Sequence, residues 1–152
     1  MRIVLQRVKK ACVTVEGVER ARIATGLVCL IGFAGGDERL PGNPLWSKMI
    51  AKITGLRIFP DKTGNMNLSV REYTGEILLV PQFTLYADCR RGRRPGFSAA
   101  LEPVLAASLF ERFVSDVRDC ESRVQAGVFG AEMDVQFINW GPVTIILDSA
   151  YF

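Results

Sequence analysis

Alternating and continuous apolar stretches in the first half of the chain predict strands. Residues Arg2 to Val18 alternate apolar and polar positions, are rich in Val and Ile, and carry Lys9-Lys10 near the middle, a pattern that predicts a β-hairpin. Gly26 to Phe33 is a short continuous apolar run, typical of a strand buried on both faces. Leu56 to Phe59, followed by a turn, and Glu76 to Val80 predict two further strands.

Two helices are predicted where apolar residues recur every three or four positions. The first begins after Asn43, a good capping residue, with Pro44 in its first turn and Gly55 able to end it in a left-handed turn. The second spans about Pro103 to Asp119. Their predicted buried residues are Trp46, Met49, Ile50 and Ile53 in the first helix and Leu105, Leu109 and Phe113 in the second.

Three more candidate strands follow the second helix, at about 122–126, 133–139 and 143–148. Both predicted helices come after strands, which suggests crossover connections packed on a mixed sheet. The chain has 152 residues, without a repeat or a linker, and this length suits one domain with one sizeable core. The fold class predicted is therefore α/β: a single compact domain with two main helices on a mixed sheet.

The composition is that of an ordinary globular protein, with 49% apolar and 23% charged residues. No apolar run approaches the length of a membrane span, and the first ten residues are too polar for a signal peptide, so we expect a cytoplasmic protein that does not enter a membrane. The four cysteines match no common zinc or redox spacing. We interpret Cys12 and Cys29 as small core residues and expect neither a metal nor a cofactor.

The chain contains no histidine, which limits its possible chemistry. A Ser-His-Asp or Cys-His arrangement cannot be built, and zinc sites lose their commonest nitrogen ligand. Any catalysis must use carboxylates, hydroxyls, main-chain groups or the substrate itself.

Three stretches carry residues that packing alone does not require. In Pro81 to Leu85, Gln82 and Thr84 occupy alternate positions at the end of a predicted strand, where they could line a pocket together or simply face water. In the second stretch, Asn139 to Thr144, the Gly-Pro step could press main chain against a ligand or be a plain turn between hairpin strands. The third, Arg90 to Arg94, is a basic loop suited to phosphate contacts or to solvent.

Several segments together resemble the D-aminoacyl-tRNA deacylase family along nearly the whole chain. They are Arg2, Gln6-Arg7-Val8, Arg57–Asp61, Gly64–Val70, Gln82–Leu85, Arg94–Phe97, Val124–Gly127, Phe129–Met133 and Asn139–Thr144. The family has two signature motifs, Ser-Gln-x-Thr-Leu and Asn-x-Gly-Pro-x-Thr. The second is complete here, whereas Pro81 replaces the serine of the first. A sibling group that clears mischarged tRNAs with relaxed chiral preference is therefore kept as an alternative, beside a non-catalytic tRNA-binding dimer.

The resemblance implies a deacylase-like fold with barrel-like strands and a homodimer with two active sites at the interface. The implied substrate is D-aminoacyl-tRNA, and glycine mischarged on the alanine tRNA is a further candidate. A cis Gly141-Pro142 step of one subunit would reach into the other's pocket, so that an L side chain collides with main chain. The site residues expected on this basis are Gln82, Phe83 and Thr84 for catalysis, and Gly141, Pro142, Asn139, Thr144, Met133, Phe129 and Arg7 for substrate binding.

A mechanism without histidine is open to such a family, because an aminoacyl ester is already activated. Main-chain amides near Phe83 and Thr84, with the Gln82 side chain, would polarise the ester carbonyl while the ribose 2′-hydroxyl orients a water. The competing mechanism makes the Thr84 hydroxyl a nucleophile, but no base to activate it is evident. Phe83, Met133 and Phe129 are candidate walls for the adenosine, or else plain core residues. Arg7 and the basic loop are candidates for phosphate contacts.

Overall fold

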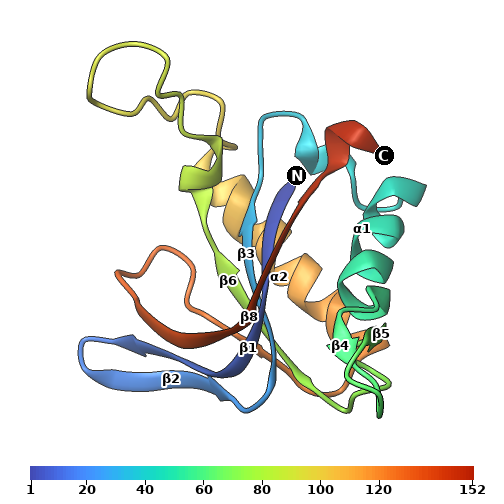
Figure 1. The fold of residues 1–152 in the computed structure, drawn as a ribbon. Coiled ribbons are helices and arrows are strands. Elements are labelled where there is room, and N and C mark those ends of the chain that lie inside the picture. Colours follow the sequence, from blue (N-terminus) through green and yellow to red (C-terminus); the bar gives the residue numbers. More distant parts are fainter.

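The computed structural model describes residues 1–152, and a mixed sheet organises the chain (Figure 1). The strands are β1 (Arg2–Val15), β2 (Val18–Ile23), β3 (Gly26–Gly32), β4 (Phe59–Pro60), β5 (Met66–Leu68), β6 (Glu76–Pro81), β7 (Val124–Ala126) and β8 (Asp134–Asp148). The helices are α1 (Pro44–Gly55) and α2 (Pro103–Cys120), with short 3-10 turns η1 (Asp37–Arg39), η2 (Phe83–Tyr86) and η3 (Ser149–Tyr151). Neither α-helix has the length and hydrophobicity to cross a lipid bilayer.

The sheet has the order β2-β1-β3-β6-β7, and β8 also pairs with β1. Pairing is antiparallel around β1, but β3 with β6 and β6 with β7 are parallel. A parallel pair needs a crossover, and α1 and α2 lie in the two connections that supply it. The expected α/β domain with crossovers on a mixed sheet is therefore confirmed.

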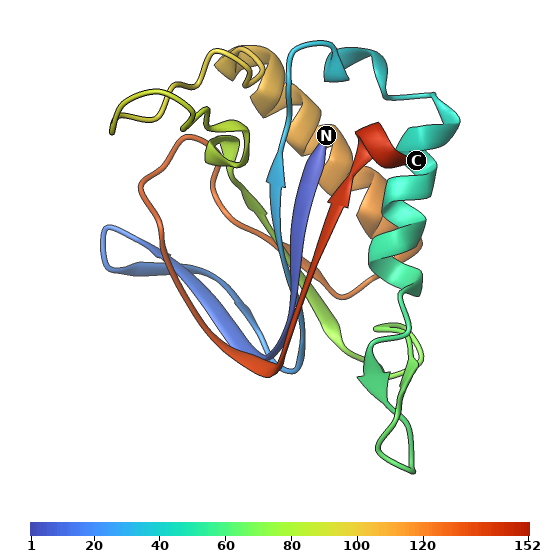
Figure 2. The ribbon, with the colours of Figure 1, turned by 45° about the horizontal axis from the view of Figure 1, so that its top comes forward.

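Each face of the sheet covers its own core. On one face, α1 and α2 pack over alternate residues of the central strands, including Leu27, Cys29 and Ile31 of β3. On the other face, the second half of β1, together with β2 and the first half of β8, folds over Val28 of β3 and its neighbours. Figures 1 and 2 show this strong bend of β1 and β8, which gives the sheet its barrel-like shape.

Three strand predictions need correction. The strand expected at Leu56 to Phe59 is reduced to the two-residue β4, Phe59–Pro60. Arg2–Val15 is one long strand, and the hairpin turn lies at Glu16-Gly17, where both residues have positive φ (52° and 74°). A two-residue turn of this kind matches the twist of the strands that it joins, whereas Lys9-Lys10 sits inside a paired strand. The two predicted C-terminal strands, 133–139 and 143–148, are likewise a single strand, β8.

The helix predictions were more accurate. The side chain of Asn43 accepts a hydrogen bond from Leu45 N (2.9 Å), and the predicted face of α1 is buried. Gly55 is the last helical residue but does not adopt a left-handed conformation, because the chain turns at once into the extended Leu56. In α2, Leu109 and Phe113 are buried, whereas Leu105 is 48% exposed beside the helix start.

Candidate active site

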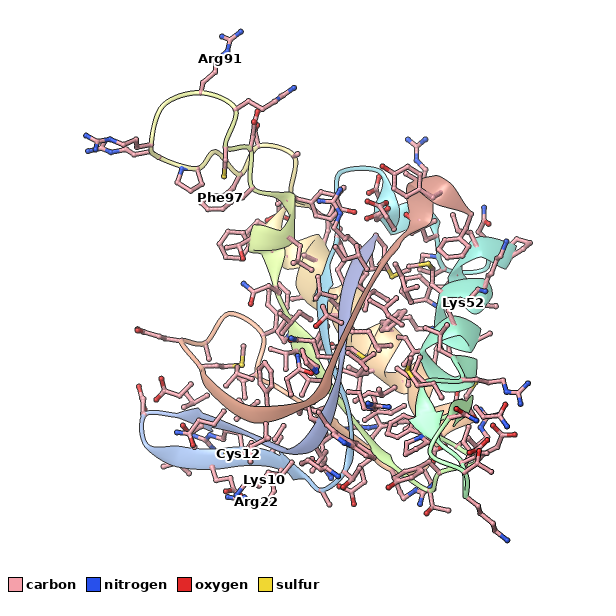
Figure 3. The ribbon with its side chains drawn as sticks, viewed as in Figure 1. Lys10, Cys12, Arg22, Lys52, Arg91 and Phe97 are labelled. Atoms are coloured by element: carbon pink, nitrogen blue, oxygen red, sulfur yellow. The ribbon has the colours of Figure 1, made fainter.

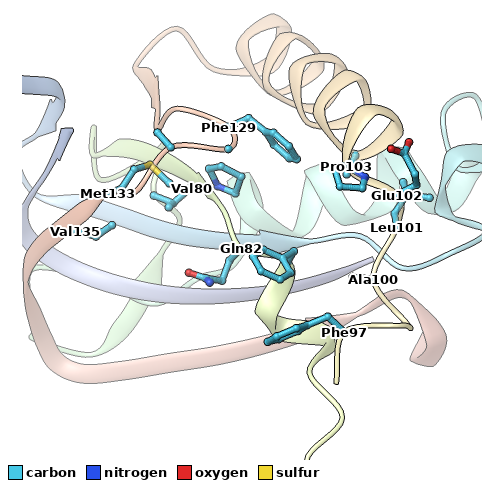
Figure 4. A pocket seen from close by; sticks show the side chains of 15 residues that line it. Val80, Gln82, Phe97, Ala100, Leu101, Glu102, Pro103, Phe129, Met133 and Val135 are labelled. Atoms are coloured by element: carbon cyan, nitrogen blue, oxygen red, sulfur yellow. The ribbon is translucent and has the colours of Figure 1, made fainter. Parts of the chain in front are cut away.

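A pocket of about 580 Å³ opens where β6 ends (Figure 4). Ten of its 15 lining residues are hydrophobic, and the only ionisable one is Glu102. The Glu102 carboxylate already caps α2 by accepting hydrogen bonds from Val104 N (3.0 Å) and Leu105 N (3.1 Å). Volume and apolar lining suit a small organic ligand held by a few polar groups.

The polar end of the pocket is formed by Gln82, with Thr84 beside it. The prediction that both residues lie on one strand is wrong, because β6 ends at Pro81 and Phe83–Tyr86 forms the 3-10 turn η2. The two side chains nevertheless meet, since Gln82 Nε2 donates a hydrogen bond to Thr84 Oγ1. The amides of Phe83 and Thr84 open η2 and have no acceptor within the turn. The Gln82 amide and the first two amides of η2 thus lie close together; Gln82 and Phe83 line the pocket, whereas Thr84 does not.

The position of η2 depends on close packing and on one arginine. A Cβ added to Gly32 would lie 2.8 Å from the Gln82 carbonyl oxygen, so β3 needs glycine where η2 crosses it. Arg2 Nη1 donates to the Leu85 carbonyl (2.7 Å), and its guanidinium carbon lies 4.9 Å from the Tyr86 ring centre. Burial raises the pKa of the Tyr86 phenol, which stays neutral at physiological pH.

Pro81 is accommodated without the loss of a sheet hydrogen bond. Gln82 N donates to Ile31 O of β3 (2.7 Å), so the nitrogen of the preceding residue faces the opposite side. On that side the pairing with β7 ends at Leu79. The proline ring instead lines the pocket, at the place where the resemblance leads one to expect a serine hydroxyl.

Three aromatic or thioether side chains, predicted from the sequence as candidate walls for an adenosine, line the pocket. Phe83 is 54% exposed and packs edge-on against Phe97, with ring centres 5.0 Å apart. Phe129 lies across the pocket and also contacts Phe110 of α2, with ring centres 6.2 Å apart. Met133 Sδ accepts from Val128 N (3.3 Å), which fixes the loop before β8. All three predicted wall residues line this pocket.

The second motif, Asn139 to Thr144, lies in the middle of β8 and is not a hairpin turn. Both flanking segments pair with β1, and the register shifts between them because the motif bulges opposite Arg7. Asn139 Oδ1 accepts from Val143 N (3.2 Å), and Asn139 Nδ2 donates to Thr144 Oγ1 (3.3 Å). The Gly141-Pro142 peptide bond is cis, as the resemblance implies, and both residues are exposed.

Arg7 holds this bulge from below. It is 7% exposed, and its guanidinium donates to Trp140 O (3.0 Å) and to Ile58 O. It also lies over the Trp140 ring, 4.4 Å from its centre, and burial lowers the pKa of the guanidinium. Arg7 is thus buried and donates to carbonyl groups of its own chain, which argues against the phosphate contact expected from the sequence.

The two motifs do not meet within one chain. None of residues 139–144 lines the pocket, and neither does Arg7. Pro81 pairs with Ile31, which pairs with Ile3 of β1, whereas the bulge lies beside Arg7, four residues along the same strand. Four residues of strand span about 13 Å.

The comparisons with known proteins agree with this architecture. The sequence model of the family described as "D-Tyr-tRNA(Tyr) deacylase" matches residues 4–148.

The chain belongs to this deacylase family.

Among its curated relatives, a protein named D-aminoacyl-tRNA deacylase from Nitratidesulfovibrio vulgaris (strain DP4) is 53% identical over 152 residues, covering 99% of this chain and 94% of the relative. A protein of the same name from Desulfitobacterium hafniense (strain DSM 10664 / DCB-2) is 50% identical, covering 98% and 97%. The family is one of enzymes.

Two solved structures share the fold. One, titled "c-Myc DNA Unwinding Element Binding Protein", has a TM-score of 0.89 and 35% identity, and covers 97% of this chain and 98% of that one. The other, a "probable eukaryotic D-amino acid tRNA deacylase", has a TM-score of 0.82 over 96% and 97%, at 24% identity. The deacylase-like fold expected from the resemblance is confirmed.

The sequence did not single out the part of the pocket contributed by the segment before α2. Ala100, Leu101, Glu102 and Pro103 line one side, facing Gln82 across the opening (Figure 4). The only local signal was Pro103, which marks a helix start and says nothing of a ligand. No three His, Cys, Asp or Glu side chains gather as a metal-binding group.

Proposed function

We propose that this chain hydrolyses the ester that joins a D-amino acid to the 3′-terminal adenosine of tRNA. The observation that carries the proposal is the hydrogen bond from Gln82 to Thr84 at the end of an apolar pocket, beside the first amides of η2. It is made in a chain that belongs to this family. The corner supplies hydrogen-bond donors without charge, which is what an ester carbonyl needs as negative charge develops on it.

The reaction needs no histidine if the substrate takes part. The Gln82 amide and the main-chain N–H groups of Phe83 and Thr84 bind the carbonyl oxygen, while the neighbouring ribose 2′-hydroxyl orients a water. The water oxygen bonds to the carbonyl carbon, and the tetrahedral intermediate collapses with loss of the ribose 3′-oxygen. That oxygen takes the proton released by the water, so a free amino acid and intact tRNA leave. The adenine ring lies among Phe83, Phe129 and Met133.

Chiral selection is assigned to Gly141 and Pro142 of a second subunit. This rests on the family resemblance and on the exposure of both residues in a strand that has β1 as its only neighbour. The exposed side chains of Ile138 (51%) and Ile146 (66%) on the same strand also suit burial against another copy. Main-chain atoms reaching the pocket from the partner would exclude an L side chain while leaving room for hydrogen, which also admits glycine mischarged on the alanine tRNA.

The dimer is tested by its mass in solution, for example by sedimentation. Ile146→Glu should give a monomer and reduce turnover at least tenfold, because each pocket then lacks the partner's Gly-Pro segment. Met66→Glu is the matched control, since Met66 is 60% exposed on β5, away from β8. An active, D-selective monomer would refute the shared site.

One substrate panel tests the function itself. Purified protein is given D-Tyr-tRNA, L-Ala-tRNA and Gly-tRNA(Ala), and ester loss is followed. Cleavage of D-Tyr-tRNA and Gly-tRNA(Ala) with L-Ala-tRNA spared supports the proposal. Cleavage of the L-substrate identifies the sibling activity, which the proline at position 81 favours. Binding without any cleavage identifies the non-catalytic module. We place the reaction in the cytoplasm.

A further inference from the structure

A basic loop, residues 89–95, projects from the rim of the pocket and takes no part in the chemistry proposed above. It contains Arg90, Arg91, Arg93 and Arg94 and no acidic residue, and every position from Cys89 to Pro95 is solvent-exposed. Figure 3 shows Arg91 at the tip, pointing away from the body of the molecule, and Phe97 at the base. With a net charge of only +3 on the whole chain, this is a local concentration of positive charge.

The base of the loop is held in a defined place. Asp88 and Gly96 form a two-hydrogen-bond bridge (2.7 and 2.9 Å), which closes the loop like a short hairpin. Phe97 follows directly and packs against Phe83, so the bridge is tied to two residues that line the pocket. The loop therefore begins and ends at the pocket entrance.

One of the four arginines is already neutralised. The Asp88 carboxylate binds Arg90 through Nε (2.8 Å) and Nη2 (2.7 Å) and also accepts from Arg90 N (3.0 Å). This pairing lowers the pKa of Asp88 below its ordinary value. Arg91, Arg93 and Arg94 make no ion pair and no side-chain hydrogen bond. Three guanidinium groups are thus available to an external anion.

The pocket, in contrast, contains no positive charge. Its lining is apolar apart from Gln82 and Glu102, so it suits a nucleoside and an amino acid but not a phosphate. A polynucleotide that ends in the pocket must carry its phosphates out through the entrance. Arginine binds phosphate through paired N–H groups, and three such side chains at one rim match a charged backbone better than a single ion.

We propose that Arg91, Arg93 and Arg94 form the docking surface for the phosphate backbone of the RNA whose 3′ end occupies the pocket. The inference rests on the proposed function, which it extends from the reacting end to the rest of the tRNA. The contacts are to phosphate and are independent of base sequence, so they raise affinity for every tRNA alike.

The test compares two substrates in the wild type and in the triple variant Arg91→Ala/Arg93→Ala/Arg94→Ala. One is D-Tyr-tRNA, and the other is 3′-O-D-tyrosyl-adenosine, which lacks phosphate. Between roughly 50 and 200 mM salt, three phosphate contacts change affinity by about 20- to 40-fold. The variant should lose that much of the salt dependence of KM for D-Tyr-tRNA, while its cleavage of tyrosyl-adenosine stays within about twofold of wild type.

Two matched variants separate charge from folding. Arg91→Lys/Arg93→Lys/Arg94→Lys keeps the charge and should keep most of the salt dependence. Arg20→Ala/Lys62→Ala/Arg118→Ala removes three exposed cations from other surfaces and should leave both substrates unaffected. Equal salt dependence in the wild type and the loop variant overturns the inference. So does an equal loss on both substrates, which would mean that the loop only shapes the pocket.

Binding of deacylated tRNA by the same variants gives a readout that does not require catalysis. If the wild type cleaves neither substrate but binds tRNA through the loop, the proposed function fails and the docking surface stands. If it cleaves both and the loop variant binds tRNA normally, the docking surface fails alone. Loss of binding to anionic vesicles with tRNA binding intact would assign the loop to a membrane surface and also overturn the inference.

Discussion

The two motif segments of this chain are built in opposite ways. Gln82 to Leu85 forms a compact turn at the pocket. Gly32 leaves the space that the turn needs, and Arg2 binds the carbonyl of Leu85. Asn139 to Thr144 forms a bulge in β8 that Arg7 holds through the Trp140 carbonyl, with Gly141 and Pro142 exposed and outside the pocket. Gln82 to Leu85 therefore lies at a pocket, whereas the Gly-Pro step of Asn139 to Thr144, which we propose selects the D-amino acid, lies away from that pocket. The proposed dimer would join the two, by bringing the Gly-Pro segment of one copy to the pocket of another.

The largest effects are expected in the segment that has the pocket. Gln82→Ala should lower kcat about 100-fold, because it removes one donor to the developing oxyanion. Thr84→Ala should have a smaller effect, since Thr84 acts by holding the Gln82 side chain, and Thr84→Ser should restore most of the activity. Single-turnover hydrolysis of D-Tyr-tRNA measures these effects. An acyl group trapped on the serine of Thr84→Ser, seen by mass spectrometry, would show that residue 84 is a nucleophile.

An intermediate effect, on selectivity rather than rate, is expected in the bulge. Gly141 has a φ of +127°, and an added Cβ would lie 2.8 Å from Arg7 Nη2, so Gly141→Ala must shift the segment. We expect the D-to-L ratio of kcat/KM to fall about tenfold, equal to about 1.4 kcal/mol of differential binding. Gly42→Ala is the control, because Gly42 also has positive φ (+83°) but open space around it. An unchanged ratio would remove the bulge from chiral selection.

The smallest effect is expected at Arg2, which contacts both the turn η2 and the end of β8. Arg2 holds η2 through Leu85 O and pairs with Asp148, at the end of β8, through Nε (2.8 Å). Burial by itself raises the pKa of Asp148, but hydrogen bonds from Ala150 N and Arg2 outweigh it and leave that pKa below its ordinary value. The carboxylate therefore stabilises the fold above its unfolded pKa of about 3.9, and this is lost as pH falls through the lower folded value.

Asp148→Asn should accordingly lower the free energy of unfolding by about 1.5–3 kcal/mol at pH 7, the range for a hydrogen bond to a charged group. The difference from wild type should shrink as the solution is acidified below about pH 4. Urea unfolding of both proteins at pH 7 and at pH 3 measures the difference in the free energy of unfolding. A difference that is the same at pH 7 and pH 3 would contradict the role given to the Asp148 charge.

The helices and the buried strand were predictable because their signals are local. Asn43, Pro44 and the apolar repeat in α1 specify a helix within a few residues, and the continuous apolar run of β3 requires burial wherever it lies. The turn at Glu16-Gly17 was missed because the two lysines offered a misleading break. The strand predicted through Gln82 was wrong because β6 ends at Pro81, two residues past its last pairing with β7, and the chain then turns into η2.

By itself, the sequence determined the residue types available for chemistry, the α/β alternation, and the two motifs that carry the family resemblance. Those properties depend on composition and on order along the chain. Only the tertiary structure decided that Gln82 contacts Thr84 in a turn and that Arg7 donates its hydrogen bonds to main-chain carbonyls. It also decided that the second motif lies outside the pocket that the first motif lines. These depend on long-range pairing and on the bend of β1 and β8, through which residues distant in sequence share or fail to share a surface.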